Sequence, residues 1–212
     1  MAGTKRKDKT EDKSAKAEVK TLRQKLSKLR KKLKKARAAL AESAPEAPAV
    51  SPLAPAAFPA LPEIDGAEFA AIAAGVRYKG RPDVMLARLA PGTRMAGVFT
   101  RSATRAAPVL DCEAKIGAAS EDGAAIVVNS GNANAFTGSN GAEAVDRITA
   151  AVAEAAGVPQ ARVFSSSTGV IGEPLPYERI TAALGDLTAQ LSPAGLPDAA
   201  RAIMTTDTFP KG

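Results

Sequence analysis

The apolar positions near the N-terminus recur every three and four residues, which is the spacing of the a and d positions in a heptad helix. The residues at these positions are Val19, Leu22, Leu26, Leu29, Leu33, Ala36 and Leu40. Most of the intervening positions are Lys or Arg. The pattern predicts a basic, amphipathic, coiled-coil-like helix over residues 18–42. Because like charges would repel across a parallel homodimer, a partner with acidic flanks suits this helix better than a second copy does.

Shorter apolar runs in the second part of the chain predict strands and helices in a mixed order. We expect strands at 83–89, 94–100, 124–129 and 163–168, where apolar runs are bounded by turn residues. We expect helices at 141–156, 177–191 and 197–202, where apolar residues follow a helical period or prolines mark a start. This mixture predicts an α/β (α+β) fold.

Changes in composition divide the chain into four segments. Residues 1–17 are polar and rich in Lys, a composition typical of disordered tails. After the helix at 18–42, residues 43–60 are rich in Pro and Ala, which is typical of an extended linker. Residues 61–212 then provide about 150 residues, which is enough for a globular core.

The positive charge is concentrated at the N-terminus. Of the 29 Lys and Arg and 22 Asp and Glu in the chain, residues 1–40 hold 16 and 4 respectively. A basic helix of this kind can bind nucleic acid, a membrane surface or another protein. No aromatic residue lies among its lysines to stack on bases, so we favour a solvated extension over nucleic-acid binding.

The residue inventory excludes several kinds of chemistry. The chain contains no His, which removes Ser-His-Asp and Cys-His catalysis and His-ligated zinc within it. Cys112 is the only cysteine, so we expect a buried small hydrophobic residue, no internal disulfide and no thiolate metal site. A single cysteine fits a reducing cytoplasmic setting. The longest apolar runs fall short of the roughly 18 residues that a membrane-spanning helix needs, so we expect no membrane partner.

Three polar segments occur where packing alone would not demand polar groups. Residues 129–138 contain three asparagines that either clamp a polar ligand or satisfy a tight loop, namely Asn129, Asn132 and Asn134. Residues 165–172 place Thr168 and Gly169 after a strand, where they form either an oxyanion site or an ordinary turn. Residues 203–212 offer hydroxyls and a carboxylate, which suit amino-acid recognition or simple turns.

In this order and at these separations, four motifs resemble the N-terminal half of the bifunctional ornithine acetyltransferase / glutamate N-acetyltransferase family of arginine biosynthesis. The motifs are GVFTRS (97–102), AIVVNSGNANAFTG (125–138), SSTGVIGEPLP (166–176) and AIMTTDTFPK (202–211). The resemblance covers about residues 59–211, and residues 1–50 look like an added segment.

The resemblance implies a self-processing fold and acetyl transfer from N-acetylornithine to glutamate. Family members cut themselves before an internal threonine, which becomes the N-terminal nucleophile of a β chain and uses its own α-amine as base. Some members also accept acetyl-CoA as a substrate, and no cofactor is implied. The family pattern implies that Thr168 and Gly169 form the oxyanion hole, and that Thr205, with Thr206 next, contacts the substrate.

This sequence stops at Gly212, before the stretch in which the family carries a substrate-binding lysine, the cleavage site and the nucleophile. We therefore expect an α-chain portion that needs the β chain of the same precursor, within an α2β2 heterotetramer when complete. One alternative is an inactive remnant or binding protein whose basic helix engages nucleic acid or an acidic partner. Another is a self-processing aminopeptidase of related architecture.

Overall fold

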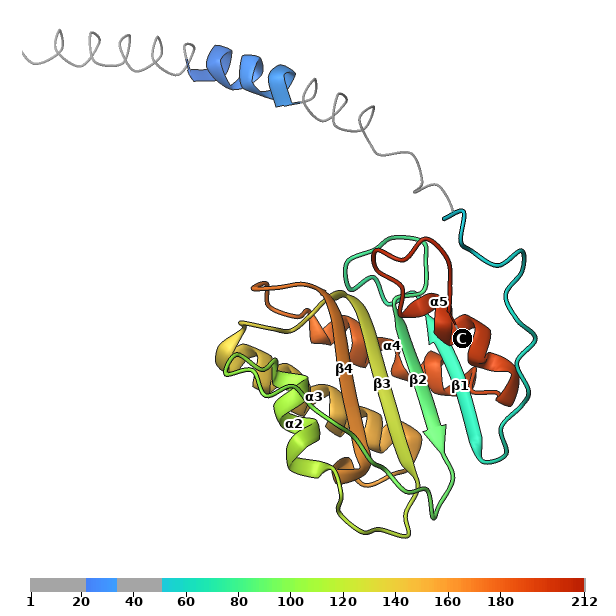
Figure 1. The fold of residues 1–212 in the computed structure, drawn as a ribbon. Coiled ribbons are helices and arrows are strands. Elements are labelled where there is room, and N and C mark those ends of the chain that lie inside the picture. Colours follow the sequence, from blue (N-terminus) through green and yellow to red (C-terminus); the bar gives the residue numbers. More distant parts are fainter. Residues whose placement is uncertain (1–21, 34–50, 212) are drawn as a thin grey trace, which may run out of the picture. The chain divides into compact units, whose positions relative to one another are not determined.

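The computed structural model describes residues 22–33 and 51–211, which belong to two separate units (Figure 1). The first unit spans Met1–Ala49 and the second spans Val50–Gly212. Among the described residues, no helix combines the length and the apolar composition needed to cross a bilayer.

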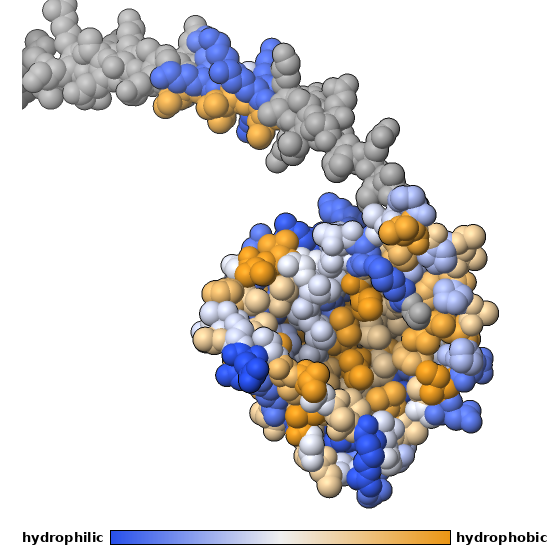
Figure 2. All heavy atoms as spheres, in the orientation of Figure 1, coloured by the Kyte–Doolittle hydropathy of each residue, from blue (hydrophilic) through white to orange (hydrophobic). Residues whose placement is uncertain are grey.

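Residues 22–33 form a helix inside the range predicted from the heptad pattern. Its four leucines lie on one side and are between 50% and 63% exposed, while Figure 2 shows the basic side chains on the other side. The remainder of the predicted helix 18–42, the tail 1–17 and part of the linker 43–60 lie outside the described residues. The predicted segment boundaries therefore stay predictions.

The second unit is built on one sheet of four strands, in the order β1-β2-β3-β4. The strands are β1 (Ala67–Ile72), β2 (Val84–Leu89), β3 (Ala124–Asn132) and β4 (Val163–Val170). β1, β2 and β3 are antiparallel neighbours, whereas β3 and β4 are parallel. A parallel pair needs a crossover, and α3 (Gly138–Ala156) with the short 3-10 helix η1 (Gln160–Arg162) provides it. The carboxyl ends of β3 and β4 therefore lie side by side.

Two helices cover one face of the sheet and form the core with it (Figure 1). These are α3 and α4 (Tyr177–Ala189). The core side chains include Val84, Leu86 and Val127 from the sheet, Ile148 and Val152 from α3, and Ile180, Leu184 and Leu187 from α4. Burying each such side chain contributes roughly 1.5–3 kcal/mol. This packing holds β3 and β4 in place from one side.

The opposite face of the sheet is also apolar but only partly covered. Cross-strand partners share a face, and one row across the four strands on this face consists of Phe69, Ala87, Ile126 and Phe164. A second row contains Met85 and Val128, both half-buried. Figure 2 shows apolar surface at the centre of the molecule, over these strands.

The helix α2 (Ala107–Lys115) packs beside β4 and α3 at the border of this apolar face. Cys112 of α2 is buried, as predicted, and its thiol lies 3.3 Å from the carbonyl oxygen of Ser165, to which it donates. Burial raises the pKa of the Cys112 thiol above its ordinary value. The thiol therefore serves packing and one hydrogen bond.

The predicted mixed α/β class is confirmed, but the predicted strand at 94–100 is wrong. β2 is already paired on both edges, by β1 and β3, so no edge of β2 is left for another strand. Residues 93–100 instead form an irregular segment that lines a recess together with α2. Two elements that the sequence analysis did not predict, β1 and α2, are present.

The remaining predicted elements are found with shifted ends. The strands predicted at 83–89, 124–129 and 163–168 correspond to β2, β3 and β4, and the last two run further at their carboxyl ends. The three predicted helices correspond to α3, α4 and α5 (Leu196–Ala202), the last preceded by the short helix η2 (Pro193–Gly195). α3 ends at Ala156 and is capped by Gly157, whose φ of 70° is the left-handed conformation expected there.

Candidate functional site

The candidate oxyanion residues lie where the parallel strands β3 and β4 end. Thr168 pairs with both Ser130 and Asn132, while Gly169 pairs with Gly131. Two residues facing one is the signature of a β-bulge, a feature that re-aims backbone groups at the ends of sheets. Thr168 is half-buried and Gly169 is exposed, so both can be reached from outside.

The backbone at this bulge requires glycine. Gly169 has a φ of 136°, which L side chains rarely adopt. A Cβ atom added to Gly169 would also lie 2.4 Å from the carbonyl carbon of Gly131. The absence of a side chain therefore lets β4 approach β3 closely and leaves the strand end uncovered beside the Thr168 hydroxyl.

The asparagines of the loop after β3 bind the protein's own backbone. Asn132 accepts a hydrogen bond from the backbone N–H of Asn134 at 2.7 Å and donates to the carbonyl of Glu173 at 3.0 Å. Asn134 is fully buried and donates to the carbonyl of Gly141 at 3.1 Å. Of the two interpretations that the sequence left open, the structure supports the tight loop rather than a clamp for a ligand.

A third asparagine ties the two strands together below the bulge. Asn129 of β3 donates to the carbonyl of Asn132 at 2.9 Å and accepts from the hydroxyl of Ser167 at 2.7 Å. Ser167 directly precedes Thr168, so this bond fixes the strand that carries the candidate oxyanion pair. Buried amides that are fully bonded in this way rigidify the site.

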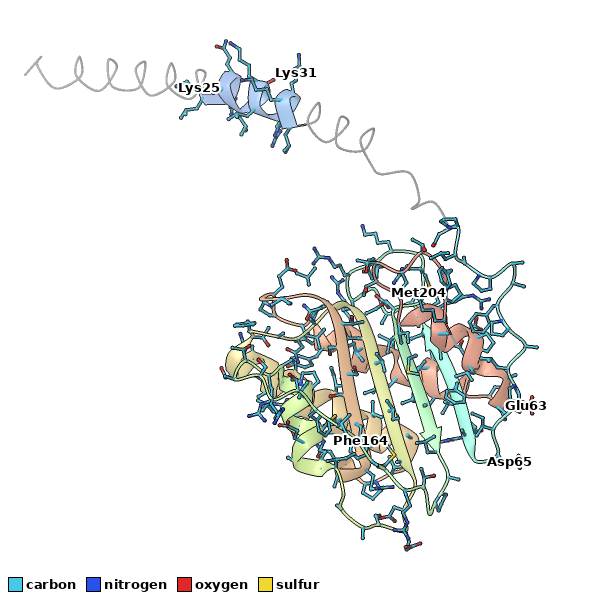
Figure 3. All side chains as sticks on the ribbon, in the orientation of Figure 1. Lys25, Lys31, Glu63, Asp65, Phe164 and Met204 are labelled. Atoms are coloured by element: carbon cyan, nitrogen blue, oxygen red, sulfur yellow. The ribbon has the colours of Figure 1, made fainter. Side chains whose placement is uncertain are left out.

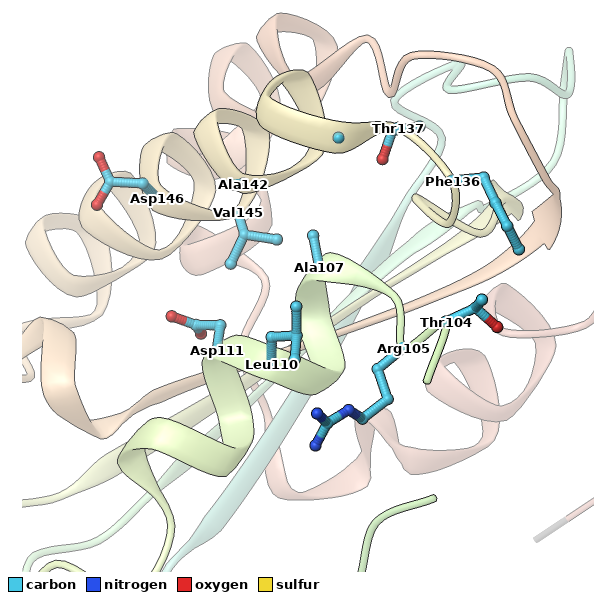
Figure 4. A pocket seen from close by; sticks show the side chains of 11 residues that line it. Thr104, Arg105, Ala107, Leu110, Asp111, Phe136, Thr137, Ala142, Val145 and Asp146 are labelled. Carbon is cyan, nitrogen blue, oxygen red and sulfur yellow. The ribbon is translucent and has the colours of Figure 1, made fainter. Parts of the chain in front are cut away.

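The same loop holds two residues other than glycine in left-handed backbone conformations. Asn134 has a φ of 46° and Phe136 a φ of 57°. Asparagine tolerates this region, but Phe rarely adopts it, and the Phe136 side chain is 70% exposed. Figure 4 shows this ring at a recess between α2 and α3. The other residues lining the recess include Thr104, Arg105, Leu110, Asp111 and Val145.

The segment that follows α5 is fastened to the same end of the sheet. The hydroxyl of Ser130, the cross-strand partner of Thr168, donates to the carbonyl of Ala202 at 2.7 Å. Arg81 donates to the carbonyl of Met204 and lies 3.4 Å from the Ser130 hydroxyl oxygen. Figure 3 shows Met204 near the ends of the strands. The segment that carries Thr205 and Thr206 is thus joined to β3 at Ser130, the cross-strand partner of Thr168.

Thr205 is half-buried and Thr206 is exposed in this segment. The carboxylate of Asp207 accepts a hydrogen bond from the backbone N–H of Thr205 at 3.4 Å and forms an ion pair with Lys211. The hydrogen bond from Lys211 lowers the pKa of Asp207 below its ordinary value. The carboxylate is therefore charged at neutral pH and caps the turn that presents the threonines.

Sequence reasoning missed three residues that build this site. Sequence reasoning assigned no role to Ser130, Arg81 or Tyr78, because their roles arise from contacts between segments far apart in the chain. Arg81 lies in the turn before β2, and its guanidinium stacks 3.9 Å from the centroid of the Tyr78 ring. Ser130 lies within the motif AIVVNSGNANAFTG, and this is the one sequence signal that pointed toward it.

The arrangement can bind a polar ligand and stabilise a negative charge that develops on a carbonyl oxygen. A hydroxyl and a backbone N–H at a strand end are the donors that such an oxyanion site needs. Within residues 22–33 and 51–211 no group of three or more Cys, Asp or Glu side chains is placed to hold a metal ion. The prediction that no cofactor takes part stays a prediction.

Most of the second unit is similar to proteins of known family. Residues 68–212 match the ArgJ family. The chain is 72% identical to the arginine biosynthesis bifunctional protein ArgJ of Ruegeria pomeroyi over 152 residues, which are 72% of this chain and 37% of that protein. It is 53% identical to the ArgJ protein of Nitrobacter winogradskyi over 153 residues, which are 71% and 37% of the two chains.

Two solved structures are similar to the second unit. The ornithine acetyltransferase of Mycobacterium tuberculosis, solved in complex with ornithine, is 34% identical with a TM-score of 0.64. That match covers 68% of this chain and 78% of the solved chain. The ArgJ structure from Bacillus halodurans is 33% identical with a TM-score of 0.60, and the match covers 68% and 75%. The chain spans little more than a third of the length of the curated relatives it matches.

Proposed function

The chain belongs to the ArgJ family, and on this premise we propose that it takes part in acetyl transfer from N-acetylornithine to glutamate in arginine biosynthesis. The observation that carries the proposal is the Thr168–Gly169 pair at an accessible strand end beside the segment of Thr205. The names of the relatives, which include an ornithine acetyltransferase with bound ornithine, support the same reaction.

In the proposed reaction the chain provides binding and electrostatic stabilisation. A threonine hydroxyl on the β chain attacks the acetyl carbonyl of N-acetylornithine, and the carbonyl oxygen becomes an oxyanion. The hydroxyl of Thr168 and the backbone N–H of Gly169 donate to that oxygen. The α-amine of the same threonine takes the hydroxyl proton and passes it to the ornithine amine as the C–N bond breaks. The glutamate amine then attacks the acetyl-threonine ester, the C–O bond breaks, and the threonine oxygen regains a proton as N-acetylglutamate leaves.

Thr205 and Thr206 hold the amino-acid part of each substrate in this proposal. Their hydroxyls lie on a turn that the Asp207 carboxylate caps and that Arg81 and Ser130 join to β3. Hydroxyls can donate and accept, so they suit ligands that carry both an amine and a carboxylate. Acetyl-CoA, if used, is a second acetyl donor and therefore a substrate.

The partner of the chain in this proposal is the β chain of the same precursor. The apolar face of Phe69, Met85, Ile126 and Val128 is only partly covered, and such a face normally packs against another layer. The relatives are nearly three times as long as the matched part, which supports a further chain that packs on this face.

Self-cleavage of the precursor is supported by the lengths of the matched proteins. The matched part makes up 78% of the solved ornithine acetyltransferase chain but only 37% of the curated relatives. A solved chain so much shorter than a full-length relative is expected if the precursor is cut into α and β chains. We propose that the complete assembly is an α2β2 heterotetramer in the cytoplasm, where this biosynthetic reaction meets its substrates.

The added N-terminal segment takes no part in the proposed chemistry. The helix at 22–33 shows exposed leucines on one side and basic residues on the other, which supports coiled-coil-type pairing with an acidic helix. The alternative in which this helix is the working part of a remnant is not favoured, because the family match lies in residues 68–212.

The proposal is tested in a complete protein. The matched 152 residues of this chain replace their counterparts in the Ruegeria pomeroyi ArgJ protein, and transfer of acetyl groups from N-acetylornithine to glutamate is measured. We expect an active, cleaved chimera. The Thr168→Ala variant should lose about 10²–10³-fold in kcat, as other oxyanion sites do when one donor is removed.

Thr181→Ala provides a matched control, because the Thr181 hydroxyl bonds only to its own helix α4, at the Glu178 carbonyl. This variant should transfer acetyl groups at the rate of the unmodified chimera. An inactive chimera that is nevertheless folded, or peptide hydrolysis in place of acetyl transfer, would refute the proposed function. Full activity of Thr168→Ala would refute the oxyanion assignment alone.

A further inference from the structure

Arg81 contacts three segments that meet at the candidate site. Its guanidinium lies 3.9 Å from the centroid of the Tyr78 ring in the turn before β2. The same group donates to the carbonyl of Met204 and lies 3.4 Å from the hydroxyl oxygen of Ser130 at the end of β3. One side chain therefore joins the β1–β2 turn, the end of β3 and the segment after α5.

The partners of Arg81 are all neutral. None of the ion pairs in the described part of the chain includes this residue. Its Nε atom is buried and lacks a hydrogen-bond partner. This arrangement lowers the stability of the folded chain, because the guanidinium loses part of its hydration on burial. No ion pair compensates for that loss, and no hydrogen bond compensates for the burial of Nε. A role in stability alone does not account for such an arrangement.

The two groups that Arg81 holds are neighbours of the two candidate parts of the site. Met204 directly precedes Thr205, and Ser130 is the cross-strand partner of Thr168. Arg81 therefore links the segment of Thr205 to the strand end that carries Thr168, together with the bond from Ser130 to Ala202. A turn that is not held in this way would have to be ordered each time a substrate binds.

We propose that Arg81 is a positioning residue, which holds the Thr205–Thr206 turn against the end of β3 so that the turn is ready to receive the amino-acid part of the substrate. The proposal rests on the proposed function and adds to it a residue that touches no substrate. Arginine is required because its planar group can stack on Tyr78 and reach a carbonyl at the same time, which a lysine ammonium cannot do.

The chain offers a matched control for this proposal. Arg162 is buried and also donates to backbone carbonyls of distant segments, those of Thr93 and Gly123. It lies at the opposite end of β4, directly before Val163, where the strand begins. Arg162→Lys therefore removes a bond of the same kind and leaves the candidate site untouched.

The experiment compares Arg81→Lys and Arg162→Lys in the Ruegeria chimera described above. Arg81→Lys should raise KM for both N-acetylornithine and glutamate about tenfold, which corresponds to the loss of one good charged hydrogen bond. Its kcat should change by less than about threefold, because binding is lost equally from the ground state and the transition state. Arg162→Lys should lower the thermal stability by at least as much and leave both KM values unchanged.

Three outcomes would overturn the proposal. The first is a KM within about twofold of the unmodified chimera for Arg81→Lys, since one hydrogen bond is worth more than that. The second is an equal rise of KM in Arg162→Lys, which would make the effect a general one. The third is a loss confined to kcat, which would place Arg81 in the chemistry itself.

If the unmodified chimera is folded but inactive, the proposed function fails and the role of Arg81 is then judged by hydrogen exchange.

Hydrogen exchange on the chain itself supplies that second readout and does not depend on activity. In the Arg81→Lys variant the backbone amides of Thr205, Thr206 and Asp207 should exchange faster, whereas those of Arg162→Lys in the same segment should match the unmodified chain. If Arg81→Lys does not fold, Tyr78→Leu replaces it, because this variant removes the stacking surface and keeps Arg81. Unchanged exchange at these three amides would refute the positioning role.

Discussion

The backbone of Gly169 lies against the backbone of Gly131. A Cβ atom on Gly169 would come within 2.4 Å of the carbonyl carbon and 2.7 Å of the carbonyl oxygen of Gly131. On its other side Gly131 faces Arg77, whose Cβ would lie 2.7 Å from a Cβ added there. Two glycines thus let three backbone segments meet at the end of the sheet, next to the Thr168 hydroxyl.

Gly169→Ala should therefore damage both folding and the oxyanion site. The new methyl group meets backbone atoms that cannot rotate away, and the φ of 136° is unfavourable for alanine. We expect the free energy of unfolding to fall by about 2–4 kcal/mol, the range typical of overpacking combined with backbone strain. Urea unfolding of the chain, followed by circular dichroism, measures this.

Gly185→Ala is the matched control for that substitution. Gly185 lies inside α4, and a Cβ added to it would meet no atom within 4 Å. Alanine is favoured over glycine in a helix by roughly 1 kcal/mol, so this variant should be more stable than the unmodified chain. A Gly169→Ala chain as stable as Gly185→Ala would show that the strands can separate at little cost.

Asn132→Ala should destabilise the loop that follows β3. The amide of Asn132 is buried and serves the backbone N–H of Asn134 and the carbonyl of Glu173. Leaving such buried partners unsatisfied costs about 1–3 kcal/mol. Asn140→Ala, at an exposed position of α3, should change stability by less than about 0.5 kcal/mol. Equal unfolding midpoints for the two variants would contradict the stabilising role of the Asn132 amide in this loop.

Local sequence patterns predicted those helices and strands that are marked by turn or cap residues at their ends or by a continuous apolar run. The family resemblance, read from four motifs, is confirmed by the match of residues 68–212. The helix α3 was predicted because Gly157 and Pro159 mark its end, and β3 because its apolar run is continuous. The strand at 94–100 failed because local composition cannot show that both edges of β2 are occupied. β1 was missed since AEFAAI has neither a strict alternation nor a continuous branched run.

Sequence motifs predicted four residues of the candidate site but not the contacts that bring them together. Thr168, Gly169, Thr205 and Thr206 came from the family pattern, and their roles stay predictions. The bonds that join their segments run through Ser130 and Arg81 over separations of 72 and 123 residues. Contacts of this range depend on the sheet order, and the sheet order depends on the whole chain.

Stability should fall at alkaline pH because of Cys112. Burial raises the pKa of its thiol, so the folded state binds this proton more tightly than the unfolded state does. The resulting stabilisation is fully present below the pKa of the unfolded thiol and is lost as the pH rises through the higher pKa of the folded protein. Unfolding curves taken from neutral to alkaline pH should show this loss.

Cys112→Ala should remove that part of the pH dependence, because alanine has no proton to release. The variant is less stable at neutral pH, since it loses the sulfur contacts and the hydrogen bond to Ser165. The difference in free energy of unfolding between the two chains should therefore shrink as the pH rises. A difference that stays constant over this range would mean that the thiol titrates equally in both states.

Self-association through the helix at 22–33 should be weak and should increase with salt. Its flanking positions in the heptad pattern carry Arg23, Lys25, Arg30 and Lys32, which face one another when two copies pair in parallel. The Debye length falls from about 10 Å at 0.1 M salt to about 3 Å at 1 M, so added salt weakens this repulsion while the leucine contacts persist. Sedimentation of the unmodified chain and of a Leu26→Ala, Leu29→Ala variant at both salt concentrations separates this effect from association through the sheet face.

Binding of nucleic acid by the same helix would depend on salt in the opposite direction, because the release of counterions makes such binding weaken as the salt concentration rises. Association that falls with salt, or that persists in the leucine variant, would exclude pairing through this helix.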